Sequence, residues 1–147
     1  AKKEIVFGNV SVIGGGLVGV ETAEYLASRG CKVTIVEMMD QIAKEESNTV
    51  LPTLMEELNS HEVKVLTSAK LMEITENAVI VEKTVDEKTE KVEVASDFVV
   101  MAVGAKKNVV ELNNCTLPIH YVGDCAGERP SNIDHAIKSA YDVACEL

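Results

Sequence analysis

The chain has 147 residues, a length typical of one domain. Apolar residues make up 46% and charged residues 26%, a composition that favours a folded protein with a sizeable core over a disordered one. Lys and Arg number 14 against 24 Asp and Glu, so the formal charge is −10. This charge disfavours nucleic-acid binding and a basic membrane-binding surface, and local dipoles would have to hold any anionic ligand.

The cysteines and the apolar segments bear on the compartment. Four cysteines are widely spaced, without a CxxC pair or a Cys/His cluster, so the sequence indicates neither a zinc site nor a disulfide framework. No stretch reaches the roughly 18 apolar residues of a membrane helix, and four glycines interrupt the apolar run at residues 10–20. We therefore expect an untargeted cytoplasmic protein with no membrane partner and no nucleic-acid partner.

The first forty residues predict a strand, a glycine turn, a helix and a second strand. Residues 10–13 form an apolar strand that runs into glycines. Small and apolar residues then recur at helical spacing from Leu17 to Arg29, and Gly30 is the expected stop. Residues 33–36 form the second strand. Because two strands joined by a helix run parallel with a right-handed crossover, we expect an α/β fold with a Rossmann-like parallel sheet.

The rest of the chain predicts more of this sheet and an antiparallel insertion. Ser47, Asn48 and Thr49 are residues that favour a helix start. The expected helices are residues 51–60 and 133–146. The expected strands of the parallel sheet are 63–66, 98–103 and 119–122, and those of an inserted three-stranded meander are 71–75, 78–83 and 91–94. The last helix is expected to bury an apolar stripe, made of Ile133, Ala136, Ile137, Ala140, Tyr141 and Ala144.

The glycine turn carries the main chemical signal. Its residues Gly14, Gly15, Gly16, Leu17, Val18 and Gly19 match the pattern GxGxxG, between a strand and a helix. The pattern alone is weak, but here an acidic residue ends the following strand. Gly14 permits the tight turn, Gly16 lets a pyrophosphate approach the backbone, and Gly19 lets the helix pack close to the strand. Free N–H groups of the first helical turn would bind the anion.

Glu37 is that acidic residue, 23 positions after Gly14. A carboxylate there accepts hydrogen bonds from an adenosine ribose 2′-OH and repels a 2′-phosphate, so NAD(H) is favoured over NADP(H). The alternative is a solvated glutamate at a strand end. Met38, Met39 and Ile42 either line an adenine pocket or are ordinary packing residues.

Together with Glu21, the glycine turn resembles the GGGxxGxE motif of the nicotinamide-nucleotide-binding domain of pyridine nucleotide-disulfide oxidoreductases. The resemblance implies that Leu17 and Val18 flank the nicotinamide pocket and that Glu21 helps to order the nicotinamide end. A simpler alternative is that Glu21, expected on the first turn of the helix, only stabilises the helix dipole.

Two further motifs match the family. Ala102, Gly104 and Asn108 match the strand-end motif A-x-G-x-x-P-N, with Lys107 in place of proline, and the resemblance places Gly104 and Ala105 among the cofactor-binding residues. Gly123-Asp124 matches the strand-end motif whose aspartate binds the ribityl chain of FAD. The alternative for the segment after it is a simple helix start, with Ser131 and Asp134 as a capping box.

More narrowly, the chain is similar to the C-terminal part of the old yellow enzyme-related reductases, which include 2-enoate reductase and 2,4-dienoyl-CoA reductase. The resemblance implies that NADH reduces FAD, that electrons pass through an iron–sulfur cluster to FMN, and that a barrel domain reduces an activated C=C bond. We expect residues 1–116 to be the NAD(H)-binding domain and 117–147 the C-terminal segment of a split FAD-binding domain. The other FAD half and the barrel would be partners from the parent chain, and the segment at 117–147 could also pair two copies as a homodimer.

Two alternatives remain open at this stage. The glycine turn could belong to an FAD-binding unit, because the flavin half of these enzymes also uses GxGxxG with a strand-end glutamate. The chain could instead be a non-catalytic NAD-sensing module. In the favoured interpretation it binds NADH weakly and catalyses nothing by itself, since the flavin lies outside it.

Overall fold

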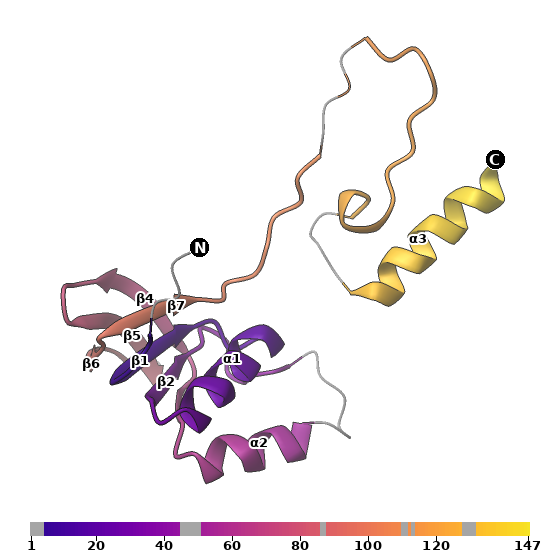
Figure 1. The fold of residues 1–147 in the computed structure, drawn as a ribbon. Helices are drawn as coiled ribbons and strands as arrows, with labels where there is room; N and C mark the ends of the chain where they lie inside the picture. The colour runs from indigo at the N-terminus through magenta and orange to yellow at the C-terminus, as the bar shows by residue number, and fades with distance from the viewer. Residues whose placement is uncertain (1–4, 45–50, 86–87, 110–111, 113, 128–131) are drawn as a thin grey trace. The chain divides into compact units, whose positions relative to one another are not determined.

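The computed structural model describes residues 5–44, 51–85, 88–109, 112, 114–127 and 132–147. The chain forms two compact units, Ala1–Val103 and Gly104–Leu147, which are described separately (Figure 1). The domain boundary expected between residues 116 and 117 falls within the second unit and stays a prediction about domain organisation. The helix start expected at Ser47, Asn48 and Thr49 lies outside the described residues.

The first unit is built on a four-stranded parallel sheet with the order β3-β2-β1-β7. Its strands are β1 (Asn9–Ile13), β2 (Lys32–Val36), β3 (Lys64–Leu66) and β7 (Phe98–Met101). Helix α1 (Leu17–Ser28) connects β1 to β2, and α2 (Leu51–Ser60) precedes β3. The expected α/β fold with a Rossmann-like sheet is therefore confirmed, although β7 ends two residues earlier than predicted.

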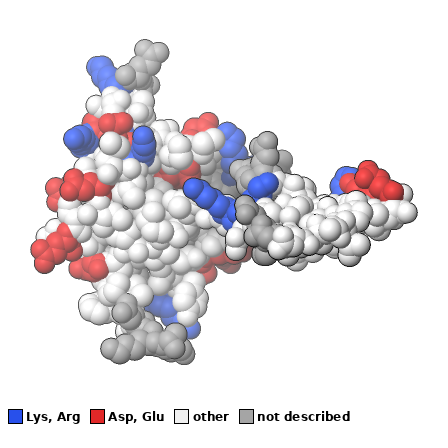
Figure 2. All heavy atoms as spheres, turned by 90° about the horizontal axis from the view of Figure 1, so that it is seen from above, with Lys and Arg blue, Asp and Glu red and all other residues white. Residues whose placement is uncertain are grey.

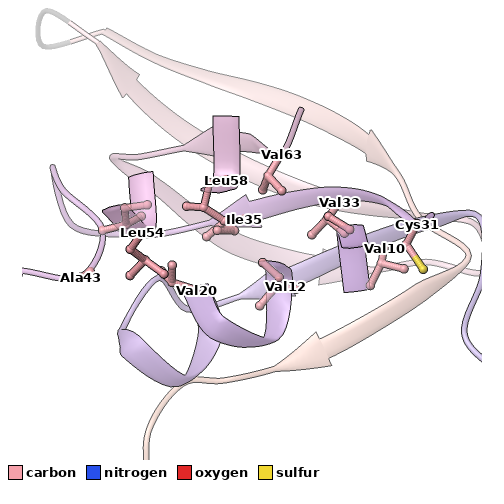
Figure 3. Packing of buried hydrophobic residues seen from close by; sticks show 13 residues of the cluster. Val10, Val12, Val20, Cys31, Val33, Ile35, Ala43, Leu54, Leu58 and Val63 are labelled. Atoms are coloured by element: carbon pink, nitrogen blue, oxygen red, sulfur yellow. The ribbon is translucent and has the colours of Figure 1, made fainter. Parts of the chain in front are cut away.

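The core follows from the period-two alternation of the strands. Val10 and Val12 of β1, with Val33 and Ile35 of β2, face the helices and are buried beside Val20 of α1 (Figure 3). On α1 the buried residues Gly19, Val20, Ala23 and Ala27 lie at helical spacing. Small side chains there let the helix lie close to the sheet, which sets where the helix begins relative to the end of β1.

The opposite face of the parallel sheet carries the meander. Strands β4 (Ala69–Ile74), β5 (Ala78–Val85) and β6 (Lys88–Ala95) pair antiparallel in a separate sheet, which confirms the expected insertion with longer strands than predicted. Val79 and Val81 pack against Ile13 and Val36 of the parallel sheet.

A buried polar contact joins the meander to β1. The hydroxyls of Ser11 and Ser96 lie 2.5 Å apart, and the Ser96 hydroxyl donates to the Val94 carbonyl at 3.1 Å. Because Ser96 has one hydroxyl proton, Ser11 donates to Ser96 when that proton points to Val94. Both serines are almost fully buried, so each hydroxyl depends on this short chain of hydrogen bonds.

The second unit contains a short 3-10 helix, η1 (Gly123–Cys125), and the long helix α3 (Ile133–Glu146). The bounds expected for the last helix are confirmed, and the Asn132 side chain begins it by accepting the His135 N–H at 3.0 Å. The strand expected at residues 119–122 is wrong, because this segment is irregular. A strand needs a neighbouring strand for its backbone hydrogen bonds, and the described residues of this unit contain no other strand.

The burial expected for the last helix is also wrong within this unit. The side of α3 that meets η1 carries Ala136 and Ser139, and the Gly123 N–H donates to the Ser139 hydroxyl at 2.8 Å. The predicted apolar stripe lies on the rest of the helix, where Ile133, Ile137 and Tyr141 are 77%, 64% and 68% exposed. Ala140 and Ala144 are exposed as well. The spacing was correct, but the unit supplies no surface to cover the stripe.

The surface agrees with the acidic composition. On the face shown in Figure 2, the Lys and Arg side chains of the described residues are scattered in small groups among Asp and Glu. None of the described helices is both long enough and apolar enough to cross a membrane.

Candidate dinucleotide-binding site

The glycine turn lies at the carboxyl ends of the parallel strands, where the chain reverses its direction of travel across the sheet. From β1 the chain moves through α1 to β2 on one side, and β7 returns on the other side of β1. Open α/β sheets bind their ligands at such a switch point. The position of the turn therefore agrees with a ligand-binding role.

Two of the glycines are required by packing. Gly14 has φ +106°, which favours glycine, and a Cβ on it would overlap the Ala102 carbonyl beside the end of β7. A Cβ on Gly19 would overlap the Gly14 carbonyl oxygen. The tight-turn role predicted for Gly14 and the close helix packing predicted for Gly19 are confirmed.

Gly16 differs from both, because a Cβ on it would meet nothing within 4 Å. Gly16 is the N-cap of α1 and has no side-chain cap, while its carbonyl accepts the Val20 N–H at 3.0 Å. The N–H groups of Gly16, Leu17 and Val18 have no hydrogen-bond partner among the described residues. An open surface with unpaired N–H groups at a helix start is a suitable environment for a phosphate.

Glu37 is held against the glycine turn. Its side chain Oε2 accepts the Gly15 N–H at 2.6 Å, and Oε1 accepts the Met39 N–H at 2.7 Å. Its backbone N–H donates to the Leu66 carbonyl at 2.8 Å, and its carbonyl accepts the Ala69 N–H at 2.9 Å. Only 9% of the residue is exposed, so the alternative of a solvated glutamate is wrong. Each carboxylate oxygen keeps a second lone pair with which it could accept a ribose hydroxyl.

The remaining predicted residues of the first unit lie on the open side of the turn. Leu17, Val18 and Met38 are 38%, 71% and 69% exposed. Glu21 is exposed too, but it lies on the second turn of α1, whose first turn has no acidic residue. Placing Glu21 on the first turn was therefore wrong. Because the dipole effect fades beyond the first turn, the helix dipole does not explain Glu21.

The structure adds residues that sequence reasoning did not place at the turn. The Ala43 N–H donates to the Gly15 carbonyl at 2.7 Å, and Ala43 has φ +48°. A Cβ on Gly15 would lie 2.6 Å from Cγ2 of Ile42, so this side chain packs directly on the turn. The apolar character of Ile42 was a weak signal. Alanine favours helices, so no pattern indicated that Ala43 would turn back to Gly15.

The other predicted site residues belong to the second unit. Asp124 lies in η1, and with Asn132, Ile133 and Ala136 it lines a hollow of about 290 Å³ at the start of α3. Gly104 has φ +87°, and both it and Ala105 are exposed. Ser131, half of the expected capping box, lies outside the described residues, and the observed cap is Asn132.

A larger hollow of about 790 Å³ lies at the opposite edge of the parallel sheet. Its lining includes Asn9, Lys32 and Lys64 near the amino ends of the strands and Glu93 of the meander. It includes no residue of the glycine turn, and it does not include Glu37. We take the switch point as the candidate site, because the unpaired N–H groups and the fixed carboxylate lie there.

The parallel sheet, the crossover through α1 and the glycine turn define a Rossmann-type domain of the FAD- and NAD-binding oxidoreductases. The chain belongs to the pyridine nucleotide-disulphide oxidoreductase family, whose sequence profile matches residues 1–121.

Relatives are parts of longer reductases. A bilirubin reductase of Mediterraneibacter gnavus is 45% identical over 145 residues, which cover 97% of this chain and 22% of the relative. A cinnamate reductase of Clostridium sporogenes is 30% identical over 141 residues, which cover 92% of this chain and 20% of the relative. A solved complex of 2-naphthoyl-CoA reductase matches with a TM-score of 0.73 and 23% identity, over 95% of this chain and 21% of that one. The chain therefore spans about a fifth of the length of these proteins.

Proposed function

We propose that this chain is the NADH-binding domain of a larger flavin-dependent reductase that acts on an activated C=C bond, as 2-enoate reductases do. The observation that carries the proposal is the Glu37 carboxylate, held by two backbone N–H groups beside a glycine turn with an open approach. Flavin and any iron–sulfur cluster would be bound largely by other parts of the parent protein.

The residues of the first unit fit a dinucleotide without rearrangement. The N–H groups of Gly16, Leu17 and Val18 would bind the diphosphate, and the absence of a Cβ on Gly16 leaves the approach open. Glu37 would accept the hydroxyls of the adenosine ribose, and Met38 would contact the adenine. A 2′-phosphate would meet a carboxylate that two hydrogen bonds prevent from moving away, so NADH is preferred over NADPH.

At the other end of the ligand, the chain would orient the nicotinamide and exclude water. Leu17 and Val18 offer exposed apolar side chains there, and Glu21 would help to order the nicotinamide amide. In the second unit, Asp124 would bind the ribityl chain of FAD, with Gly104 and Ala105 as further cofactor contacts. When bound, the nicotinamide supplies a hydride and the flavin accepts it, while the protein supplies the alignment.

The type of substrate is supported by the relatives. Cinnamate carries a C=C bond conjugated to a carboxylate, which is the bond that a 2-enoate reductase would reduce. The parent protein should therefore oxidise NADH in the presence of cinnamate but not of its saturated analogue, 3-phenylpropanoate. Oxidation of NADH at equal rates with both compounds would contradict the proposed substrate class.

Calorimetric titration of the 147-residue chain tests the binding role. We expect NADH to bind more tightly than NADPH, and Glu37→Ala to narrow the difference because the repelling carboxylate is gone. Glu21→Gln is the control, since it removes an exposed carboxylate that does not contact the ribose end. An equal or reversed preference in the wild-type chain would exclude the role of Glu37, and flavin absorbance at about 450 nm in the purified chain would favour an FAD-binding unit instead.

We also propose the cytoplasm as the location. All four cysteines, Cys31, Cys115, Cys125 and Cys145, are free thiols in the structure. Free thiols persist in a reducing compartment. Immunoblotting of fractionated cells that express the parent protein should find it with cytoplasmic markers, and recovery in the membrane or secreted fraction would contradict this location.

A further inference from the structure

We propose that Ala43 is a positioning residue for nucleotide binding, because it holds residues 38–43 against Gly15 as a fixed wall at the adenosine end of the site. The proposal rests on the proposed function of this site as an NADH-binding site. It assigns a task to a segment in which only the methionines and Ile42 had been considered as possible ligand contacts.

Both ends of the segment are attached to the same peptide unit of the turn. At the start, Glu37 accepts the Gly15 N–H at 2.6 Å, and at the end, the Ala43 N–H donates to the Gly15 carbonyl at 2.7 Å. Between these two bonds, Ile42 is 4% exposed and packs on Gly15 so closely that a Cβ there would lie 2.6 Å from its Cγ2. The two segments therefore form one rigid surface, and the position of either depends on the other.

The middle of the segment is anchored to the turn between β3 and β4. The Met39 N–H donates to Oε1 of Glu37 at 2.7 Å, and the Met39 carbonyl accepts the Ser68 N–H at 2.7 Å. The side chains of Met38 and Met39 remain 69% and 47% exposed. Methionine is a flexible apolar side chain that adapts to flat ligands, so a fixed backbone with two free methionines suits a purine ring.

Ala43 is where this arrangement is most sensitive to substitution. Its φ of +48° lies in the left-handed region, which is unfavourable for residues with a Cβ and most unfavourable for β-branched ones. The residue is only 3% exposed, and its N–H is committed to Gly15. A β-branched residue would move the backbone out of this region and break the bond to Gly15, whereas glycine would adopt the same conformation freely.

The test compares Ala43→Val with Ala43→Gly, using calorimetry with NADH and ADP-ribose and an NMR titration with reduced nicotinamide mononucleotide (NMNH). For Ala43→Val we expect Kd for NADH and for ADP-ribose to rise together by about tenfold, with Kd for NMNH changed less than about twofold. Ala43→Gly should bind ADP-ribose within about twofold of the wild type. Partial unfolding would lower the binding-competent fraction equally for all three ligands, so the difference between ADP-ribose and NMNH is the diagnostic readout.

Several results would overturn the proposal. One is a folded Ala43→Val chain that binds ADP-ribose like the wild type, and another is an equal loss for ADP-ribose and NMNH. Should Ala43→Val fail to fold, Ile42→Val removes one methyl group from the contact with Gly15 and should weaken NADH and ADP-ribose, but not NMNH, by about threefold. A wild-type chain that binds neither NADH nor ADP-ribose would instead refute the proposed function, and this proposal with it.

Discussion

Glu37 has a structural task as well as its proposed contact with the ribose. Two backbone N–H groups, those of Gly15 and Met39, end on its carboxylate, and its own backbone bonds to the residues around the start of the meander. A strand-end glutamate recognised from its spacing alone would be assigned only to the ligand. The structure shows that this residue also connects the glycine turn to the rest of the unit.

The first prediction follows from those hydrogen bonds. In the absence of ligand, Glu37→Ala should lower the free energy of unfolding by about 1–3 kcal/mol, because two buried N–H groups lose a charged acceptor. Glu37→Gln should lower it less, since one amide oxygen can still accept. Urea denaturation followed by circular dichroism measures both, with Glu21→Gln as the exposed control. Wild-type stability in Glu37→Ala would show that the two bonds contribute nothing to folding.

A second prediction compares two glycines of the same turn. Gly19→Ala should reduce stability by about 3 kcal/mol or fail to fold, because its Cβ would overlap the Gly14 carbonyl. Gly16→Ala has open space at its Cβ, so the chain should remain folded and lose affinity for NADH instead. Thermal unfolding and calorimetry separate the two effects. A stable Gly19→Ala chain, or a Gly16→Ala chain with unchanged NADH affinity, would contradict these assignments.

At the scale of elements, the meander and the parallel sheet are joined by more than apolar contacts. Val79 and Val81 provide an apolar interface, while Ser11 and Ser96 place a hydroxyl pair in the same buried layer. Buried hydroxyls are tolerated only when they are paired, so this contact also determines how the two sheets are aligned.

A double-mutant cycle tests this pair. Ser96→Ala alone should destabilise the chain by about 1–3 kcal/mol, because the Ser11 hydroxyl loses its partner in a buried site. The double variant Ser11→Ala with Ser96→Ala should be less destabilised than the sum of the single variants, since no hydroxyl is then left unpaired. The free energies of unfolding in urea give the coupling. Additive effects would mean that the two hydroxyls do not interact.

For the whole molecule, the second unit is the part that lacks a covering surface. The stripe of Ile133, Ile137 and Tyr141 is exposed on α3, and the segment at 119–122 forms no strand. In a protein of which this chain is about a fifth, other parts of the parent would cover these groups. Without those parts, a second copy of the chain would be the available apolar partner.

We therefore predict that the 147-residue chain self-associates through α3. Sedimentation velocity should show a dimer that increases with concentration, and Ile137→Asp should shift it to the monomer because a charge would be buried in the contact. Lys138→Gln, on the neighbouring polar surface, is the control. A wild-type chain that is monomeric at all concentrations, with disordered NMR signals for its last 25 or so residues, would contradict the dimer.

The first unit could be predicted from sequence in most respects, and the second could not. The strands around Val12 and Ile35, the helix after Gly16 and the packing role of Gly19 follow from local periodicity and from the geometry that only glycine adopts. The strand at 119–122 and the burial of Ile137 were predicted from equally good patterns and were wrong. Those patterns report that a residue is suited to burial, but burial also needs a partner surface, which the described second unit does not contain.

The sequence by itself determined the α/β class, the glycine turn and the presence of a carboxylate at the end of β2, because each depends on a few neighbouring residues. Only the tertiary structure decided that this carboxylate binds Gly15 and Met39, and that Ala43 returns to the same peptide. Those contacts join residues 22 and 28 positions apart in the chain, and their geometry depends on how β1, β2 and the meander pack together.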